Sequence, residues 1–226
     1  MIDAIITDIE GTTSSLSFVK DTLFPYASEH LADFVYSHQH CEDVTAILRA
    51  VDLEIGRALN VDESIAQLLA WAQADQKITP LKSLQGLIWQ KGYVDGDFKG
   101  HIYFDALTAL QNWHQKGIAL YVYSSGSISA QKLLFAHTEY GDVNPVFSGY
   151  FDTTIGGKKA AFSYRAIVEH IQVAADRCLF LSDIIEELDA AKQAGLQTCQ
   201  IVRDSATQPG QGHQFVSNFS QIQLIH

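Results

Sequence analysis

Short apolar runs that end in polar turns are the feature that most constrains how this chain can fold. They occupy residues 2–7, 118–123, 179–181 and 198–202. Runs this short and this apolar are typical of parallel strands that are buried on both faces. Helical patterns lie between them, and the alternation of strand and helix from residue 99 onward predicts a doubly wound α/β fold with a mostly parallel sheet.

The helices of this part of the chain are predicted from apolar residues at helical spacing. Two of them, at residues 105–116 and 186–194, are followed by Gly117 and Gly195, and glycine commonly stands where a helix ends. Ser163 is expected to be the N-cap of a further helix.

Residues 14–98 show helical spacing with no strand alternation. The third helical pattern in this stretch opens at Thr79 and Pro80, which we expect to be its N-cap and first residue, and is expected to end at Gly92. We therefore predict an α/β core formed by residues 1–13 and 99–226. The all-helical segment 14–98 is predicted to be a cap domain inserted after the first strand.

The charge of the chain excludes several classes of partner. Its 226 residues include 26 acidic and 15 basic residues, which gives a net charge of −11. Binding to nucleic acid or to an anionic membrane depends on neutralisation by Lys and Arg, so neither is expected. A phosphorylated small molecule remains compatible, because a local cation can reverse the field inside one pocket.

The N-terminus and the cysteines indicate the compartment. The first apolar run is too short for a signal peptide, and no run approaches the roughly 18 apolar residues of a membrane span. Cys41, Cys178 and Cys199 form no CxxC pair and are expected to be reduced thiols. We therefore expect a cytoplasmic protein.

Polar residues stand where the predicted strands end. In an open α/β sheet, the loops that leave the carboxyl ends of the strands converge on one crevice. The residues expected at this edge are Asp8, Glu10, Ser124, Ser125, Lys158 and Asp183. Carboxylates, hydroxyls and an ammonium together suit a phosphate ester that is held with a divalent metal.

Each of these residue types has a task in phosphoryl transfer. The Asp8 carboxylate can attack phosphorus and form an aspartyl-phosphate, which splits one difficult displacement into two easier ones. Mg²⁺ held by Asp8 and Asp183 would remove the repulsion between carboxylate and phosphate. Lys158 adds a compact positive charge against the phosphoryl oxygens. Ser124 and the backbone amides after it could bind those oxygens, helped by the N-terminus of a helix that begins near Ser127.

The same residues carry a resemblance to known enzymes. In chain order, residues 8–13, residues 124–127, Lys158 and Asp183 resemble the four motifs of haloacid-dehalogenase-type phosphatases. Glu10 stands where that superfamily usually has Asp. Further segments resemble the enolase-phosphatases (acireductone synthases) of methionine salvage, and these are residues 8–13, 17–26, 88–93, 151–158 and 180–183. The resemblance extends from residue 1 to residue 203.

The resemblance implies a bifunctional enzyme with one magnesium ion per subunit. Such an enzyme enolises 2,3-diketo-5-methylthiopentyl 1-phosphate and then removes the phosphate to give the acireductone 1,2-dihydroxy-3-keto-5-methylthiopentene. Asp8, the backbone carbonyl of Glu10 and Asp183 would hold Mg²⁺. Asp8, Glu10 and Lys158 would be the catalytic residues, and the longer side chain of Glu10 could carry protons in either half-reaction.

The resemblance also implies how the substrate is held. Ser124, Ser125 and Lys158 would bind its phosphate, so the expected partner is a small phosphate ester. Lys159, adjacent to Lys158, is expected to be a surface charge. We expect a monomer, although the sequence does not fix the oligomeric state.

Two other functions remain open at this point. One is a phosphatase of the same superfamily that acts on another small phosphate ester without enolisation. The other is a non-catalytic binding module, against which the complete set of motif residues argues. A nucleotide-binding Rossmann domain is disfavoured because no GxGxxG follows any predicted strand.

The sequence leaves several roles undecided. Glu187 could orient the Asp183 loop or simply begin a helix, and His101 could face the substrate or pack at the return into the core. The base for enolisation, the residues that bind the methylthio tail, and whether another divalent ion replaces Mg²⁺ are also not fixed by the sequence.

Overall fold

The structure, a computed structural model, describes residues 1–204 and 208–224. Its centre is a six-stranded sheet with the order β3-β2-β1-β4-β5-β6, and every neighbouring pair in it is parallel. The strands are β1 (Ala4–Thr7), β2 (Ala119–Tyr123), β3 (Gly149–Phe151), β4 (Cys178–Ser182), β5 (Gln197–Ile201) and β6 (Gln214–Val216). The predicted doubly wound α/β fold is therefore confirmed.

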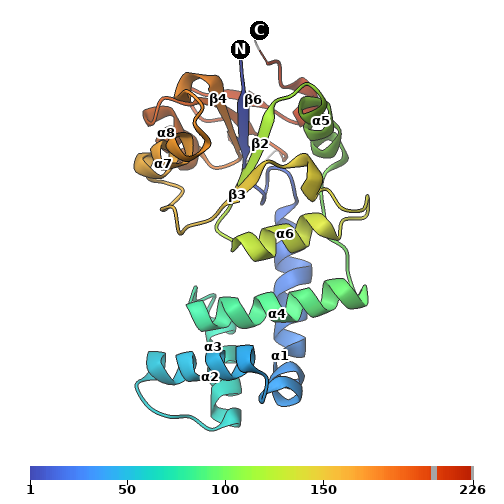
Figure 1. Ribbon diagram of the computed structural model, residues 1–226, viewed down its shortest axis with the longest axis vertical. Helices are drawn as coiled ribbons and strands as arrows, with labels where there is room; N and C mark the ends of the chain where they lie inside the picture. The colour runs from blue at the N-terminus through green and yellow to red at the C-terminus, as the bar shows by residue number, and fades with distance from the viewer. Residues whose placement is uncertain (205–207, 225–226) are drawn as a thin grey trace. The chain divides into compact units, whose positions relative to one another are not determined.

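The α-helices of the described residues are α1 (Phe24–His38), α2 (Glu42–Ile55), α3 (Val61–Gln73), α4 (Thr79–Asp95), α5 (Phe104–Gln115), α6 (Ile128–Ala136), α7 (Ala161–Ile171) and α8 (Ile185–Gln193). A π-helical segment, Phe18–Leu23, precedes α1, and 3₁₀ turns lie at Asn144–Val146, Ala175–Arg177 and Phe219–Gln221. Helices α7 and α8 cover one face of the sheet, and α5 covers the other (Figure 1).

The chain divides into two compact units. One comprises Met1–Leu16 with Lys99–His226 and contains the sheet, and the other comprises Ser17–Phe98 and is helical. The helical unit has its own core, in which Leu31, Leu68 and Leu84 are almost completely buried. That this unit acts as a cap remains a prediction.

Burial on both faces explains why the sheet strands are apolar along their whole length. Ile5 and Ile6 in β1 point to opposite faces, and both are fully buried. Ile6 packs in a cluster with Tyr164 of α7 and Phe180 of β4, where Tyr164 and Phe180 meet edge to face with their ring centroids 5.0 Å apart. A polar side chain placed within such a strand would lose its hydration, so polar groups collect where the strands end.

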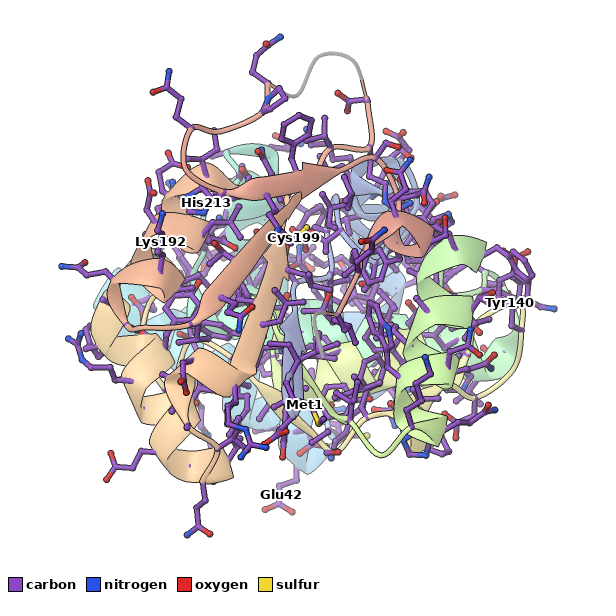
Figure 2. All side chains as sticks on the ribbon, turned by 90° about the horizontal axis from the view of Figure 1, so that it is seen from above. Met1, Glu42, Tyr140, Lys192, Cys199 and His213 are labelled. Carbon is purple, nitrogen blue, oxygen red and sulfur yellow. The ribbon has the colours of Figure 1, made fainter. Side chains whose placement is uncertain are left out.

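The edge strand β6 is held in place through contacts with α8 and β5. Lys192 of α8 donates to the carbonyl of Gly212 at 2.8 Å, and these two segments lie together in Figure 2. The buried His213 side chain joins Thr198, at 2.8 Å from its Nδ1, to Asp189, at 3.0 Å from its Nε2. These contacts hold β6, which the sequence did not predict, beside β5.

One predicted helix end was wrong. Helix α4 continues through Gly92 and ends at Asp95, with Gly96 in the left-handed conformation at φ 79°. A Cβ atom at Gly92 would lie 2.5 Å from the Phe98 ring and 2.8 Å from Tyr26. Glycine is needed there for close packing and not to stop the helix.

Two predicted helix caps were also wrong. Helix α7 begins at Ala161 after Ala160, so Ser163 lies inside the helix, where its hydroxyl donates to the carbonyl of Gly157 at 2.8 Å. Helix α4 is preceded by Ile78, and Thr79 is its first residue.

Among the helices of the described residues, none is both long and apolar enough to cross a membrane.

Candidate active site

The topology of the sheet brings Asp8 and Asp183 together. The chain passes from β1 to β2 and β3 on one side, and then returns to place β4 on the other side of β1. Ligand sites of open α/β sheets lie at such a reversal, outside the carboxyl ends of the strands. Asp8 directly follows β1, Asp183 directly follows β4, and the Asp8 amide donates to the carbonyl of Leu181 at 2.9 Å.

A tight turn follows Asp8. The Gly11 amide donates to the carbonyl of Ser14, and the Ser14 amide donates to that of Ile9, both at 2.8 Å. Gly11 has φ 76°, a conformation that L side chains rarely adopt. A Cβ atom here would lie 2.4 Å from Oδ2 of Asp183. Glycine thus allows both the turn and the close approach of the second acid.

The Thr12 hydroxyl lies between the two acids. It donates to Oδ2 of Asp8 at 3.5 Å and accepts from the Asp183 amide at 3.1 Å. Thr12 is fully buried, so water does not compete for these contacts. One side chain therefore connects the loops that follow β1 and β4.

Lys158 is paired with two carboxylates. Its ammonium forms an ion pair with Oδ1 of Asp8 and another, at 2.8 Å, with Oε2 of Glu187. Burial lowers the pKa of Lys158, but the charges of Asp8 and Glu187 outweigh this effect and hold the pKa above its ordinary value. The side chain is only 10% exposed and stays protonated.

The backbone that carries Lys158 is fixed by hydroxyl groups. Tyr123 donates to the carbonyl of Gly156 at 2.8 Å, and Tyr164 donates to that of Lys158 itself at 2.6 Å. Ser163 holds the residue between them, Gly157. The β2 end and the first turn of α7 thus position the lysine.

Glu187 has a defined place in this group. Its Oε2 accepts from the Ser182 hydroxyl at 2.9 Å and from Lys158. Burial and then the charge of Asp8 raise the pKa of Glu187, while Lys158 opposes both. Glu187 lies in the first turn of α8 and also contacts Ser182, the residue before Asp183, so the structure is compatible with both roles left open for it.

Asp183 has the features of a metal ligand. Burial, followed by the charge of Asp8, raises the pKa of Asp183 to about 7. Its Oδ1 is buried and accepts no hydrogen bond from the described residues. No group of three or more His, Cys, Asp or Glu within those residues is arranged around a metal. Two carboxylates still fit Mg²⁺, because this ion retains several waters and needs few protein ligands.

The serines lie at the end of the neighbouring strand. Thr7 pairs with Val122, so β2 ends beside β1, and the buried Ser124 follows it. Its Oγ accepts from the Gly126 amide at 3.2 Å. The exposed Ser125 comes next in this turn, and Ser127 is the N-cap of α6, where the sequence predicted a helix to begin.

Comparisons with known proteins identify the family of this chain. The family model of haloacid dehalogenase-like hydrolases matches residues 2–195. Enolase-phosphatase E1 of Thioalkalivibrio sulfidiphilus is 54% identical, covering 90% of this chain and 91% of its own. The same enzyme of Pseudomonas savastanoi pv. phaseolicola is 53% identical, covering 98% and 97%. The chain belongs to the enolase-phosphatase E1 family.

A solved structure supports the fold of this enolase-phosphatase. The UTR4 protein of Saccharomyces cerevisiae superposes with a TM-score of 0.83 at 33% identity, and the match covers 98% of this chain and 100% of that one. The predicted family, its place among haloacid dehalogenase-like hydrolases and the prediction of a phosphatase of methionine salvage are confirmed. The roles of the individual site residues remain predictions.

His101 contacts the segment that follows the Asp8 turn. Its Nδ1 accepts from the Ser15 amide at 3.0 Å and lies 3.2 Å from the Ser14 hydroxyl. Its ring meets Tyr103 edge to face, with the centroids 4.8 Å apart. The half-buried Glu10 lies in the turn after Asp8.

Sequence reasoning missed Gln200, although it is fully buried in β5. Its Nε2 donates to the carbonyl of Asp183 at 3.1 Å, and its Oε1 accepts from the Gly210 amide at 2.7 Å. Together with Thr12, which holds the Asp183 amide, it fixes both sides of this residue. A glutamine within an apolar strand was the available signal, because a buried amide requires partners.

Replacing Gly11 by alanine is expected to reduce activity by displacing Asp183. Gly117→Ala is a matched control, because Gly117 has φ 81° and no atom within 4 Å of its Cβ position. Left-handed backbone should cost each variant about 1–2 kcal/mol of unfolding free energy. We expect kcat to fall by at least about tenfold only in Gly11→Ala, as a 1 Å misplacement can cost about 100-fold. Equal activity of the two variants would contradict this role.

His101 is expected to titrate below its ordinary pKa of 6.5. Burial lowers the pKa of His101, the charge of Glu139 opposes this, and that of Arg203 adds to it. The folded protein then binds fewer protons than the unfolded chain as the pH falls through about 6.5, so its unfolding free energy should decrease there and level off below the folded pKa. NMR titration, with His101→Gln for assignment, measures the midpoint. His101→Gln should lose this part of the acid destabilisation, and a midpoint at or above 6.5 contradicts the prediction.

Proposed function

We propose that this enolase-phosphatase converts 2,3-diketo-5-methylthiopentyl 1-phosphate into the acireductone 1,2-dihydroxy-3-keto-5-methylthiopentene and phosphate. The observation that carries the proposal is the juxtaposition of Asp8, Asp183 and protonated Lys158 at the reversal of the sheet. This arrangement combines a carboxylate nucleophile with a fixed cation and a second carboxylate.

Asp8 is the nucleophile of the phosphatase step. One of its carboxylate oxygens attacks phosphorus, and the bond between phosphorus and the C1 oxygen breaks to leave an aspartyl-phosphate. Water then attacks this intermediate, which releases phosphate and restores Asp8. Lys158, already paired with Asp8, offers its ammonium to the phosphoryl oxygens as charge spreads over them.

Asp8, the backbone carbonyl of Glu10 and Asp183 would hold one Mg²⁺. Haloacid dehalogenase-like hydrolases are typically magnesium-dependent. The buried Oδ1 of Asp183 and its raised pKa support a cation at this position. The ion would supply positive charge that offsets the repulsion between the carboxylates and the substrate phosphate.

Glu10 carries the protons in both half-reactions. In enolisation, a proton leaves C1 of the diketone and another is gained by the adjacent carbonyl oxygen. In phosphoryl transfer, the C1 oxygen leaves and takes a proton, and the attacking water loses one. Glu10 lies in the Asp8 turn and is half-buried, which allows it to reach solvent and substrate. Its side chain is one methylene longer than the aspartate usual in this superfamily.

The substrate phosphate is bound by Ser124 and Ser125 together with Lys158. Backbone amides at the N-terminus of α6 favour an anion at this turn.

The helical unit Ser17–Phe98 serves as a cap that excludes water from the first displacement. The enzyme acts as a monomer in the cytoplasm.

Incubation of the protein with Mg²⁺ and the diketo phosphate should give enol absorbance before phosphate appears. Asp8→Asn should release phosphate at least about 1000-fold more slowly, because an amide is a poor nucleophile. Asp142→Asn, an exposed change in the sheet unit, serves as the control and should keep full activity. Phosphate release without an enol phase would indicate the simple phosphatase, and undiminished release by Asp8→Asn would exclude the mechanism.

Glu10→Gln should slow both half-reactions by about 100-fold or more, since a glutamine cannot exchange the proton. Enol absorbance and phosphate release are followed separately in the same reaction. Glu186→Gln is the matched control, because Glu186 is exposed and pairs only loosely with Lys159 at 3.4 Å. Unimpaired turnover of Glu10→Gln in both steps would rule out this role.

A further inference from the structure

Arg203 binds the backbone of the catalytic turn. It lies just beyond the end of β5, and its Nε and Nη2 donate to the carbonyl of Thr12 at 3.1 and 2.8 Å. Two donors of one guanidinium thus converge on one oxygen, from a residue 191 positions away in the chain. A lysine could not reproduce this geometry, because its ammonium is a compact point charge and lacks the rigid planar fork of donors that a guanidinium has.

The opposite edge of the guanidinium is held by Asp105. Nη1 of Arg203 donates to both carboxylate oxygens, at 2.8 and 2.9 Å. Oδ2 of Asp105 also accepts from the Phe219 amide at 2.8 Å. Burial raises the pKa of Asp105, but the hydrogen bonds from Arg203 and the Phe219 amide outweigh it, so the net pKa lies below its ordinary value.

Two aromatic rings restrict the remaining freedom of the guanidinium. Its central carbon lies 3.9 Å from the centroid of the Tyr103 ring and 5.4 Å from that of Phe219. The Tyr103 amide also donates to the carbonyl of Thr13 at 2.9 Å. Arg203 is only 13% exposed, so the whole group is fixed against the turn.

We propose that Arg203 is a positioning residue for phosphoryl transfer, holding the Thr12 backbone so that the Thr12 hydroxyl spans Asp8 and Asp183. This inference rests on the proposed function of the two acids. The Thr12 contact with Asp8 is long, at 3.5 Å, and a small shift of the backbone would break it. The same shift would release the Asp183 amide, which donates a hydrogen bond to the Thr12 hydroxyl at 3.1 Å.

A purely structural role for Arg203 makes different predictions. The same contacts also join α5 to the turn at Phe219–Gln221, so loss of Arg203 could lower stability alone. In that case kcat would be unchanged at temperatures where the variant is folded. A positioning role instead lowers kcat and Mg²⁺ affinity in the folded protein.

The test compares Arg203→Gln and Arg203→Lys with the wild type, well below their melting temperatures. We expect kcat of Arg203→Gln to fall by at least tenfold, with KM changed less than threefold, and Arg203→Lys to lie between the two. The Kd of Mg²⁺, measured by isothermal titration calorimetry without substrate, should rise at least threefold in Arg203→Gln. Wild-type kcat and Kd of Mg²⁺ in Arg203→Gln would overturn the proposal, and full activity of Arg203→Lys would contradict the role of the guanidinium fork.

Asp105→Asn tests the connection through Arg203. If Asp105 acts by orienting the guanidinium, the double variant Asp105→Asn/Arg203→Gln should be no slower than Arg203→Gln alone. Losses that multiply in the double variant would overturn the proposal. If thermal melting shows that Arg203→Gln does not fold, Arg203→Lys and Asp105→Asn are compared with the wild type in its place.

Arg177→Gln is the matched control. Arg177 pairs with Asp3 near the opposite ends of the strands and is more exposed than Arg203, so its loss removes an arginine–aspartate ion pair away from the site. It should keep wild-type kcat, and an equal loss in both arginine variants would assign the effect to general destabilisation and overturn the proposal. Asp8→Asn separates the two ideas: if it is inactive while Arg203→Gln is normal, only the positioning role fails.

Discussion

The site depends on how the sheet holds several carboxyl groups close to one another. Asp8 and Glu187 form ion pairs with the ammonium of Lys158, whose charge also acts on Asp183. Burial, followed by the charge of Asp8, raises the pKa of Asp183 to about 7, although Lys158 is protonated. Buried charges of one sign are tolerated only when cations or protons offset them. The negative excess therefore favours a divalent cation, which would in turn allow a phosphate dianion to approach.

Such a site also needs rigid surroundings, since charges stabilise a transition state most when they need not reorganise. The structure provides this through the backbone. Hydroxyl groups of Tyr123 and Tyr164 fix the carbonyls around Lys158, and Gln200 fixes that of Asp183. Most of these groups come from strand ends or from the first turns of helices. The sheet thus determines the geometry of the site, while the loops contribute little freedom of their own.

Much of the fold could be predicted because burial on both faces leaves a clear record in the sequence. The β1 strand and Asp8 were predicted together, since an apolar run must stop where a charge begins. Strand β6 was missed because it is short, lies at the sheet edge and exposes Phe215. Gly92 was misread for a different reason: its need for glycine comes from Phe98 and Tyr26, which only the packed helical unit brings against it.

The site could be predicted only in part, for the same physical reason. Motif residues can be recognised in the sequence because their reactive side chains follow the ends of strands. The groups that position them come from distant parts of the chain and contact them only in the folded structure. Thr12 was visible as part of the motif, yet its contact with the Asp183 amide joins residues 171 positions apart. Arg203 reads in the sequence as an ordinary charge after a strand, and nothing local indicates that it binds the turn after β1.

Enolisation and phosphate removal in one site restrict which residue can transfer protons. Oδ1 of Asp8 is paired with Lys158 and Oδ2 lies beside Thr12, so the proposed nucleophile is engaged on both oxygens. A carboxylate held in this way is poorly suited to exchange protons with carbon in one step and with oxygen in the next. Glu10 is in the same turn but only half-buried, and it has a longer side chain. These contacts therefore support the proposed division of labour, in which Asp8 attacks phosphorus and Glu10 transfers protons.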